Sequence, residues 1–250
     1  MDLNRRSMLA VAMVIGLLTA PNIVSAQSAP PSGTPPSAAP PSASPPSPEA
    51  SPGSTGTLPA LKAPLAAGHY TSDILGAPLG FDLADDAWKG DQLDGQFLEL
   101  TRQMGAGSGV LSVMTFDGKV ATDPCAPAFD GQIEMTAAAF TDWLTALPAL
   151  STTATPTTLF GLPATRLDTT VLATACPDSP FILLWDGFRL YPSEAMRVIT
   201  TEAGGKIIIV SAETVQSIDL PDFLDAAQPV IDSMSLSPAG SSSPAPPPSA

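Results

Sequence analysis

Histidine is almost absent from this 250-residue chain, which limits the chemistry that the protein can perform. His69 is the one histidine, so zinc sites built from several histidines are excluded. A Ser-His-Asp hydrolase would have to use His69, and no G-x-S-x-G motif accompanies it. Two carboxylates could still catalyse hydrolysis, because the distance between them is set by the fold and is not visible in the sequence. We expect a non-catalytic protein with no cofactor and no metal, and keep an unrecognised carboxylate hydrolase as an alternative.

Basic residues are also scarce. The chain has 10 Lys and Arg against 24 Asp and Glu, which gives a formal net charge of −14. Such a surface repels phosphate groups, so we expect neither nucleic acid nor an anionic membrane surface as a partner. The charge is compatible with cationic ligands, although solubility alone explains it.

Only two cysteines are present. Cys125 follows Pro124 and Cys176 precedes Pro177, so both are expected in loops. No C-x-x-C motif suggests a redox role, and no cysteine follows the first apolar segment, as a lipoprotein would require. Two loop cysteines in an exported protein predict a structural Cys125–Cys176 disulfide.

The apolar run at the amino terminus is too short for a membrane span. Met8 to Ala20 is about 13 residues long, and a spanning helix needs roughly 20. Because Arg5 and Arg6 precede it, the pattern predicts a signal peptide cleaved between Ala26 and Gln27, with an uncleaved anchor as the alternative. Paired arginines also fit a twin-arginine signal, so the general and twin-arginine export routes both stay open. We expect a secreted or extracytoplasmic (cell-envelope) protein with no stable membrane span after cleavage.

Composition divides the chain into four parts. These are a signal peptide (1–26), a disordered Pro/Ser-rich linker (27–57), a single domain (58–237) and a disordered Pro/Ser-rich tail (238–250). Segments of Pro, Ser and Ala bury too little apolar surface to offset their chain entropy. The linker is either a spacer, glycosylated or not, that holds the domain away from a membrane or wall, or a plain flexible tail.

Two-residue turn motifs indicate an antiparallel sheet. Asp-Gly and Gly-Gly pairs supply the positive φ angles of tight hairpins. They occur at Asp94-Gly95, Asp117-Gly118, Asp130-Gly131, Asp186-Gly187 and Gly204-Gly205. The strands predicted around them, from apolar alternation, are 97–101, 110–116, 164–171, 181–185, 188–191, 196–200 and 206–211.

Two segments have the apolar period of amphipathic helices. Thr136–Leu147 has an N-cap at Thr136 and a stop at Pro148. Pro221–Ser233 has a second apolar stripe, which Pro229 should kink or shorten. We therefore predict an α+β fold, in which two or more amphipathic helices cover a mainly antiparallel sheet.

A diffuse pattern resembles a known family. The segments concerned are Gly68–Ser72, Pro78–Leu83 with Trp88, Gly161–Ala164, Ile207–Val210 and the helix before Asp232-Ser233-Met234. Over most of Tyr70 to Leu236 they resemble secreted bacterial domains with a PsbP/Mog1-like α+β sandwich fold. The resemblance implies an antiparallel sheet between helices and a role in interaction or ligand holding, without a shared catalytic motif.

Acidic residues gather between Asp82 and Asp94. The carboxylates of Asp82, Asp85, Asp86, Asp91 and Asp94 are numerous enough for calcium, but their spacing is not that of an EF-hand. A solvated acidic loop is the simpler interpretation, and a weak calcium site stays open.

Three further patterns have ordinary explanations. Gly105–Gly109 lacks the Gly-Lys-Ser/Thr ending of a phosphate loop and predicts a turn. Asp168-Thr169-Thr170 has no second copy, which an aspartic protease would need. Some aromatic side chains could line a groove for an apolar or sugar ligand, but core packing is the simpler role. These are Trp88, Trp143, Trp185, Phe140 and Phe181.

Taken together, these patterns predict an exported, non-catalytic domain that binds an envelope component or a small ligand. One alternative is a carrier that holds a small hydrophobic ligand in a cavity between sheet and helices. The sequence identifies neither the partner nor the ligand, nor the oligomeric state.

Overall fold

The computed structural model describes residues 54–58, 63–93, 97–105, 107–126, 128–185, 188–192, 194–214, 216 and 219–237. The predicted signal residues Arg5, Arg6, Ala26 and Gln27 lie outside these ranges, as do most of the predicted linker and the predicted tail. The turn motifs at 94–95 and 186–187 also lie outside them.

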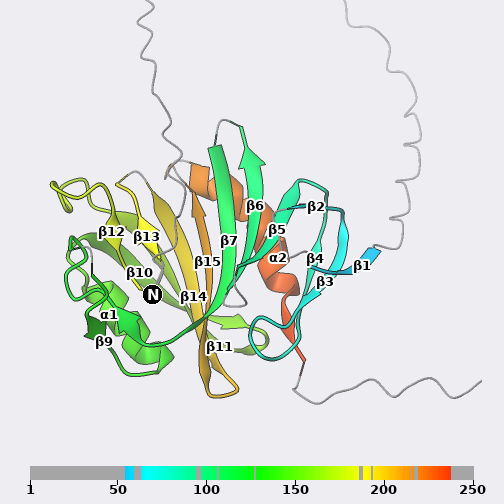
Figure 1. Cartoon of the computed structure of the whole chain (residues 1–250), viewed down its shortest axis with the longest axis horizontal. Coiled ribbons are helices and arrows are strands. Elements are labelled where there is room, and N and C mark those ends of the chain that lie inside the picture. The colour runs from blue at the N-terminus through cyan, green and yellow to red at the C-terminus, as the bar shows by residue number, and fades with distance from the viewer. Residues whose placement is uncertain are drawn as a thin grey trace, which may run out of the picture. The chain divides into compact units, whose positions relative to one another are not determined.

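An eight-stranded antiparallel sheet forms the centre of the domain (Figure 1). Its strand order is β10-β11-β14-β15-β7-β6-β5-β2. In chain order the strands are β2 (Ala63–Leu65), β5 (Trp88–Leu93), β6 (Phe97–Met104), β7 (Gly107–Phe116), β10 (Leu150–Leu159), β11 (Leu162–Val171), β14 (Ala195–Ala203) and β15 (Lys206–Thr214).

A second sheet of four short strands has the order β1-β3-β4-β16. Its strands are β1 (Ser54–Thr57), β3 (Gly68–Ser72), β4 (Leu79–Leu83) and β16 (Ser235–Leu236). β1 pairs with β3 in parallel and begins just before Leu58, where we expected the domain to start. Two small hairpins complete the β structure: β8 (Lys119–Val120) with β9 (Gly131–Gln132), and β12 (Ile182–Leu183) with β13 (Arg189–Leu190).

Both faces of the central sheet are buried, as the run of β-branched residues in β15 shows. Successive side chains of a strand point to opposite faces. Ile207 and Ile209 belong to one hydrophobic cluster, whereas Ile208 and Val210 belong to the other. All four are at most 3% exposed, so the sheet is the middle layer of the domain.

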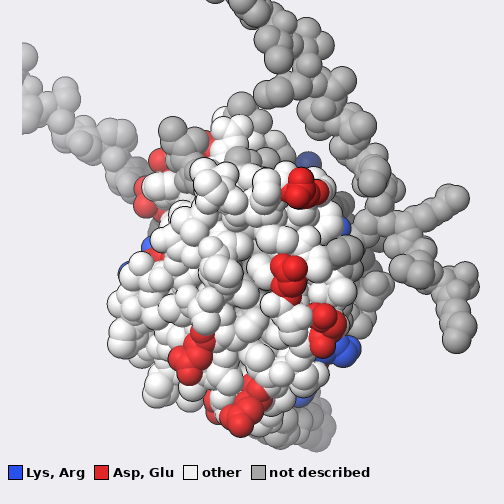
Figure 2. Space-filling model, turned by 90° about the vertical axis from the view of Figure 1, so that its left-hand side faces the viewer, with Lys and Arg blue, Asp and Glu red and all other residues white. Residues whose placement is uncertain are grey.

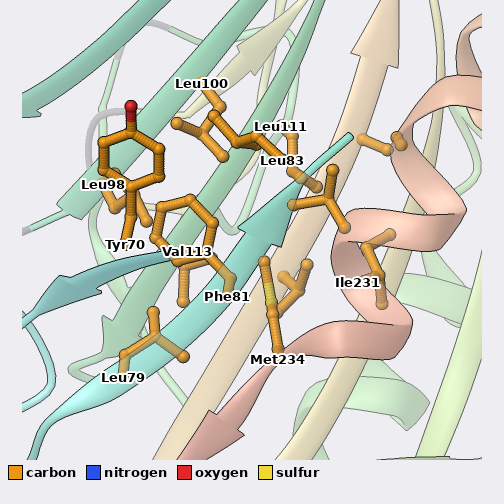
Figure 3. Packing of buried hydrophobic residues seen from close by; sticks show 14 of the residues in the cluster. Tyr70, Leu79, Phe81, Leu83, Leu98, Leu100, Leu111, Val113, Ile231 and Met234 are labelled. Carbon is orange, nitrogen blue, oxygen red and sulfur yellow. The ribbon is translucent and has the colours of Figure 1, made fainter. Parts of the chain in front are cut away.

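Helix α2 (Leu220–Ser233) and the four-stranded sheet together cover one face. Figure 3 shows Phe81 and Leu83 of β4 in one cluster with Ile231 of α2 and with Leu111 and Val113 of β7. A fully buried side chain of this size contributes about 1.5–3 kcal/mol through the hydrophobic effect. The strand β4 contributes three buried side chains to this layer and the helix contributes four.

Helix α1 (Ala137–Ala146) lies on the opposite face, with residues of the β12–β13 hairpin. Thr136 is its N-cap, as predicted, and its side chain accepts a hydrogen bond from the Ala139 amide at 3.1 Å. Phe140 is completely buried and meets the ring of Trp185 edge-on at 5.3 Å. These aromatic contacts hold α1 against the sheet.

The predicted fold class is wrong in what covers the sheet. The domain is dominated by strands, and its two described helices have only 10 and 14 residues. Helices of that length extend about 15 and 21 Å, whereas eight paired strands are about 34 Å wide. One short helix cannot cover such a face, so the four-stranded sheet and the hairpins cover the rest. Both helices were predicted from the sequence, but the strands Gly68–Ser72 and Leu79–Leu83 were not.

The predicted disulfide between Cys125 and Cys176 is confirmed, with Cα atoms 5.1 Å apart. Helix α2 continues through Pro229 to Ser233, so the expected shortening does not occur. Within the described residues, neither helix has the length and apolarity to cross a membrane.

Gly109 in β7 lies directly beneath the ring of Phe223 in α2. A Cβ atom at position 109 would overlap the ring carbons of Phe223, which is completely buried. We expect Gly109→Ala to lower the free energy of unfolding by about 1–3 kcal/mol, because overpacking forces the helix away from the sheet. Denaturant titration measures this loss, and the double variant Gly109→Ala/Phe223→Leu should recover part of it. A Gly109→Ala variant as stable as the parent chain would contradict the close contact.

Candidate functional site

His69, the one residue available for a Ser-His-Asp site, lies on the exposed face of the four-stranded sheet. Its Nδ1 is 2.7 Å from Oδ1 of Asp82 on the neighbouring strand. Ser235 of β16 lies nearby, since a Cβ on Gly80 would be 3.1 Å from its Oγ and 3.3 Å from His69 Nε2. No hydrogen bond joins Ser235 to His69 in the described part of the chain, and both side chains are exposed. The arrangement thus lacks the contact between nucleophile and base that this chemistry requires.

Among the described residues, the acidic side chains of the segment from Asp82 to Asp94 do not form a cation site. Asp82 pairs with His69, and Asp85 pairs with Arg102 at 2.6 Å. The hydrogen bond from Arg102 lowers the pKa of the Asp85 carboxyl. The side chains of Asp91 and Asp94 lie outside the description. Nowhere in the described ranges do three or more potential ligands gather around a point suited to a metal ion.

A cavity of about 540 Å³ lies between this loop and α2. Its wall includes Asp85, Arg102, and Asp222 and Asp225 of the helix. The guanidinium of Arg102 is already engaged, since it also lies 5.4 Å above the ring of buried Trp88. None of the buried polar atoms that lack a partner in the described residues lines this cavity. Asp85 and Arg102 pair with each other and Asp222 and Asp225 are exposed to water, so no charged group of this cavity requires a ligand.

A second cavity, of about 370 Å³, is mainly apolar and is called here the turn pocket. It lies at the end of the central sheet, where the β10–β11 and β14–β15 turns meet the loop after β3 and the strand β16. Two of its residues, Leu75 and Ile208, belong to the buried core, so the pocket opens directly from that core to solvent. Its apolar walls are Leu75, Phe160, Leu162, Ala203, Ile208 and Leu236.

Lys206 is the one charged residue in the wall of the turn pocket. It begins β15 and shares a sheet face with Ile208, so its side chain extends toward the pocket. Its Nζ donates a hydrogen bond to the Leu75 carbonyl at 2.9 Å. Gly76 has a φ of 74°, and a Cβ there would be 3.0 Å from this Nζ. A residue without a side chain therefore lets the ammonium reach the loop.

Three glutamates interact on the opposite face of the sheet. Glu213 of β15 lies two residues beyond Ser211, and Ser211 pairs with Ser112, which pairs with Glu99 of β6. Burial and the neighbouring carboxylates of Glu194 and Glu99 raise the pKa of Glu213 to about 8. Burial also raises the pKa of Glu194 to about 7, although the Tyr191 amide donates to its carboxylate at 2.7 Å. At neutral pH this group holds fewer negative charges than its composition suggests.

The surface around α1 shows no continuous charged patch. In Figure 2 the Asp and Glu side chains on this side stand apart from one another among uncharged residues. Solubility accounts for charge distributed in this way, and no cationic partner is required to explain it.

The other predicted motifs have structural roles. Trp185 and Phe140 are at most 2% exposed and form core, and Trp88 is equally buried but borders the cavity beside α2. Trp143 and Phe181 are half-buried. Asp168 accepts a hydrogen bond from Arg197 Nε at 2.7 Å across neighbouring strands. Gly105 lies in the turn after β6, as predicted, whereas Gly107–Gly109 already belong to strand β7.

Sequence patterns gave no indication of the turn pocket. Its walls come from segments up to 162 positions apart, such as Leu75 and Ser237, and three of the four segments are turns or loops. The sequence does place one pocket residue: Lys206 directly follows the Gly204-Gly205 turn and precedes a run of isoleucines. This position predicts a positive charge at the edge of the core.

Comparisons with known proteins do not place the chain in a family. No protein-family model matches it. No curated protein matches it either. A similar solved structure is that of LpqN from Mycobacterium tuberculosis, described as involved in cell envelope biogenesis. The identity is 13%, the match covers 71% of this chain and 91% of the other, and the TM-score is 0.35. A TM-score of this size does not establish a shared fold, so the PsbP/Mog1-like resemblance is not confirmed and no function follows from the match.

Proposed function

We propose that this protein is an exported, non-catalytic binding domain that holds a small apolar ligand in the turn pocket. The observation that carries the proposal is an apolar cavity of about 370 Å³ that opens from the core to solvent. Ligand pockets in proteins have volumes of about 300–1,000 Å³ and are mostly apolar with a few placed polar groups. The turn pocket has this size and this composition.

The location outside the cytoplasm is part of the same proposal. It is supported by the Cys125–Cys176 disulfide, because such bonds persist mainly in oxidising compartments. It is further supported by the signal pattern around Arg5, Arg6 and the Ala26-Gln27 junction. The export route is left open by both observations.

The proposed site differs from the carrier cavity that the sequence suggested. That cavity was expected between sheet and helices, whereas turns, a loop and the strand β16 form the walls of the turn pocket. No residue of α1 or α2 lines it. The ligand would therefore enter at the end of the sheet and leave both helices in place.

A neutral apolar fluorophore such as N-phenyl-1-naphthylamine tests the proposal directly. We expect saturable binding to the purified protein, and at least a tenfold loss of affinity in Ala77→Trp, because an indole would fill the pocket beside Gly76. Ala173→Trp is the matched control, since Ala173 is exposed and lies outside the pocket. Unsaturable binding, or equal affinity in all three proteins, would rule out the turn pocket as the site.

The carboxylate hydrolase is the second candidate, and one observation favours it. Glu213 and Glu194 interact, and their raised pKa values of about 8 and 7 would keep one acid protonated near neutral pH. No cavity among those described is lined by either residue. We therefore rank this candidate below the binding domain. Release of nitrophenol from nitrophenyl glycosides that disappears in Glu213→Gln would reverse the ranking.

A further inference from the structure

We infer that the ligand of the turn pocket is a single-chain organic anion, whose apolar chain fills the cavity and whose charged end is bound by Lys206. The inference rests on the proposed function and adds the chemical class of the ligand. It depends on the positive charge of Lys206, on the lack of acidic residues in the pocket wall and on the apolar surface of the remaining wall.

The pocket wall carries a positive charge in a strongly acidic protein. Acidic residues outnumber basic residues by 24 to 10 in the chain, yet no Asp or Glu lines this cavity. The cavity beside α2 shows the opposite composition, with three aspartates and one arginine. An anion therefore meets favourable charge only in the turn pocket of these two cavities.

The ammonium of Lys206 has capacity for another acceptor. No carboxylate lies within ion-pair distance of it in the described residues, whereas Lys119, Arg102 and Arg197 each have such a partner. Its contact with the Leu75 carbonyl uses one of the three N–H donors of a lysine. The remaining donors can reach an anionic oxygen without breaking the contact that holds the loop.

The apolar wall dictates the rest of the ligand. Leu75, Ile208 and Phe160 offer hydrocarbon surface and no hydrogen bonds, so a polar chain such as a sugar would lose its water there without compensation. A flexible acyl or alkyl chain would replace water at this surface favourably. The charged end then lies at the mouth, because Lys206 is exposed. The shared chemistry is a hydrocarbon chain with a terminal carboxylate or phosphate.

Calorimetric titration with three probes of equal chain length tests the inference. They are dodecanoate, dodecyl phosphate and dodecanol, all below their aggregation concentrations. We expect at least one anion to bind about tenfold or more tightly than dodecanol, as a charge-assisted hydrogen bond provides. The preferred anion identifies the head group. Lys206→Met should remove this preference, so that the two anions bind no more tightly than dodecanol, whereas Lys206→Arg should keep most of it.

The outcomes separate the two levels of the proposal. If dodecanol and both anions bind equally to the parent chain and to Lys206→Met, the inference is wrong and the apolar binding function stands. If no probe binds, the proposed function fails as well. Ala77→Trp should weaken all three probes together, and denaturant titration of each variant shows whether it is folded.

Discussion

Removing the disulfide should lower the free energy of unfolding by about 4 kcal/mol, the largest effect that we expect from any single change. Cys125 and Cys176 close a loop with a sequence separation of 51 residues. Without the disulfide the unfolded chain gains conformational entropy, because an open loop of this length has far more conformations than a closed one. This gain stabilises the unfolded state. Denaturant titration of the double variant Cys125→Ser/Cys176→Ser, compared with the parent chain under non-reducing conditions, measures the effect.

The structure also predicts which region is destabilised when the disulfide is removed. The disulfide ties the loop after β8 to the segment before β12, and buried Cys176 packs in the cluster under α1. Hydrogen exchange should therefore accelerate first around Ile182 and Leu183, whereas β6 and β7 stay protected. Adding reductant to the double variant serves as the control and should change nothing. A parent chain whose stability is unaffected by reductant would contradict a structural role for the bond.

Stability should fall as the pH rises from about 5 to about 8. Glu213 has a folded-state pKa of about 8, raised from 4.5 by burial and by Glu194 and Glu99. A raised pKa means that the folded state holds its proton at pH values where the unfolded chain has lost it. The stabilising effect is therefore complete below about 4.5 and is lost as the pH passes through about 8. Each such proton contributes up to about 1.4 kcal/mol per pH unit within this window.

Glutamine at position 213 isolates this contribution, because it has the shape of a protonated glutamate and does not titrate. We expect Glu213→Gln to be more stable than the parent chain at pH 8 and to show a smaller loss of stability between pH 5 and pH 8. Glu134→Gln is the matched control, since Glu134 is exposed and lies before α1. An unchanged pH dependence in Glu213→Gln would mean that Glu213 is ionised in the folded protein at neutral pH.

The features of this fold that could be predicted from the sequence depend on residues close together in the chain. The Gly204-Gly205 turn has φ angles of 59° and 74°, and it joins β14 to β15 as the motif predicts. The cap at Thr136 and the apolar stripe of α1 likewise depend only on neighbouring residues. The disulfide was predictable because two cysteines allow one pairing.

The features that were not predicted depend on packing between residues far apart in the chain. The strand β10 was missed because Thr residues and Pro156 weaken the apolar alternation, and an edge strand tolerates both. The short strands β3 and β4 become regular only because they pack against α2 and the central sheet (Figure 3). The turn pocket depends on four segments meeting at one end of the sheet, so no window of sequence contains it.

Methyl-resolved NMR of the protein during titration with dodecanoate tests the central claim most directly. If the ligand occupies the turn pocket, shifts should appear at the methyl groups of Leu75, Leu162, Ile208 and Leu236, and should saturate together. Methyl groups in the core under α1, such as Leu144, should stay unchanged. Saturable shifts at Val230 beside the acidic cavity, or no saturable shifts at all, would contradict the account.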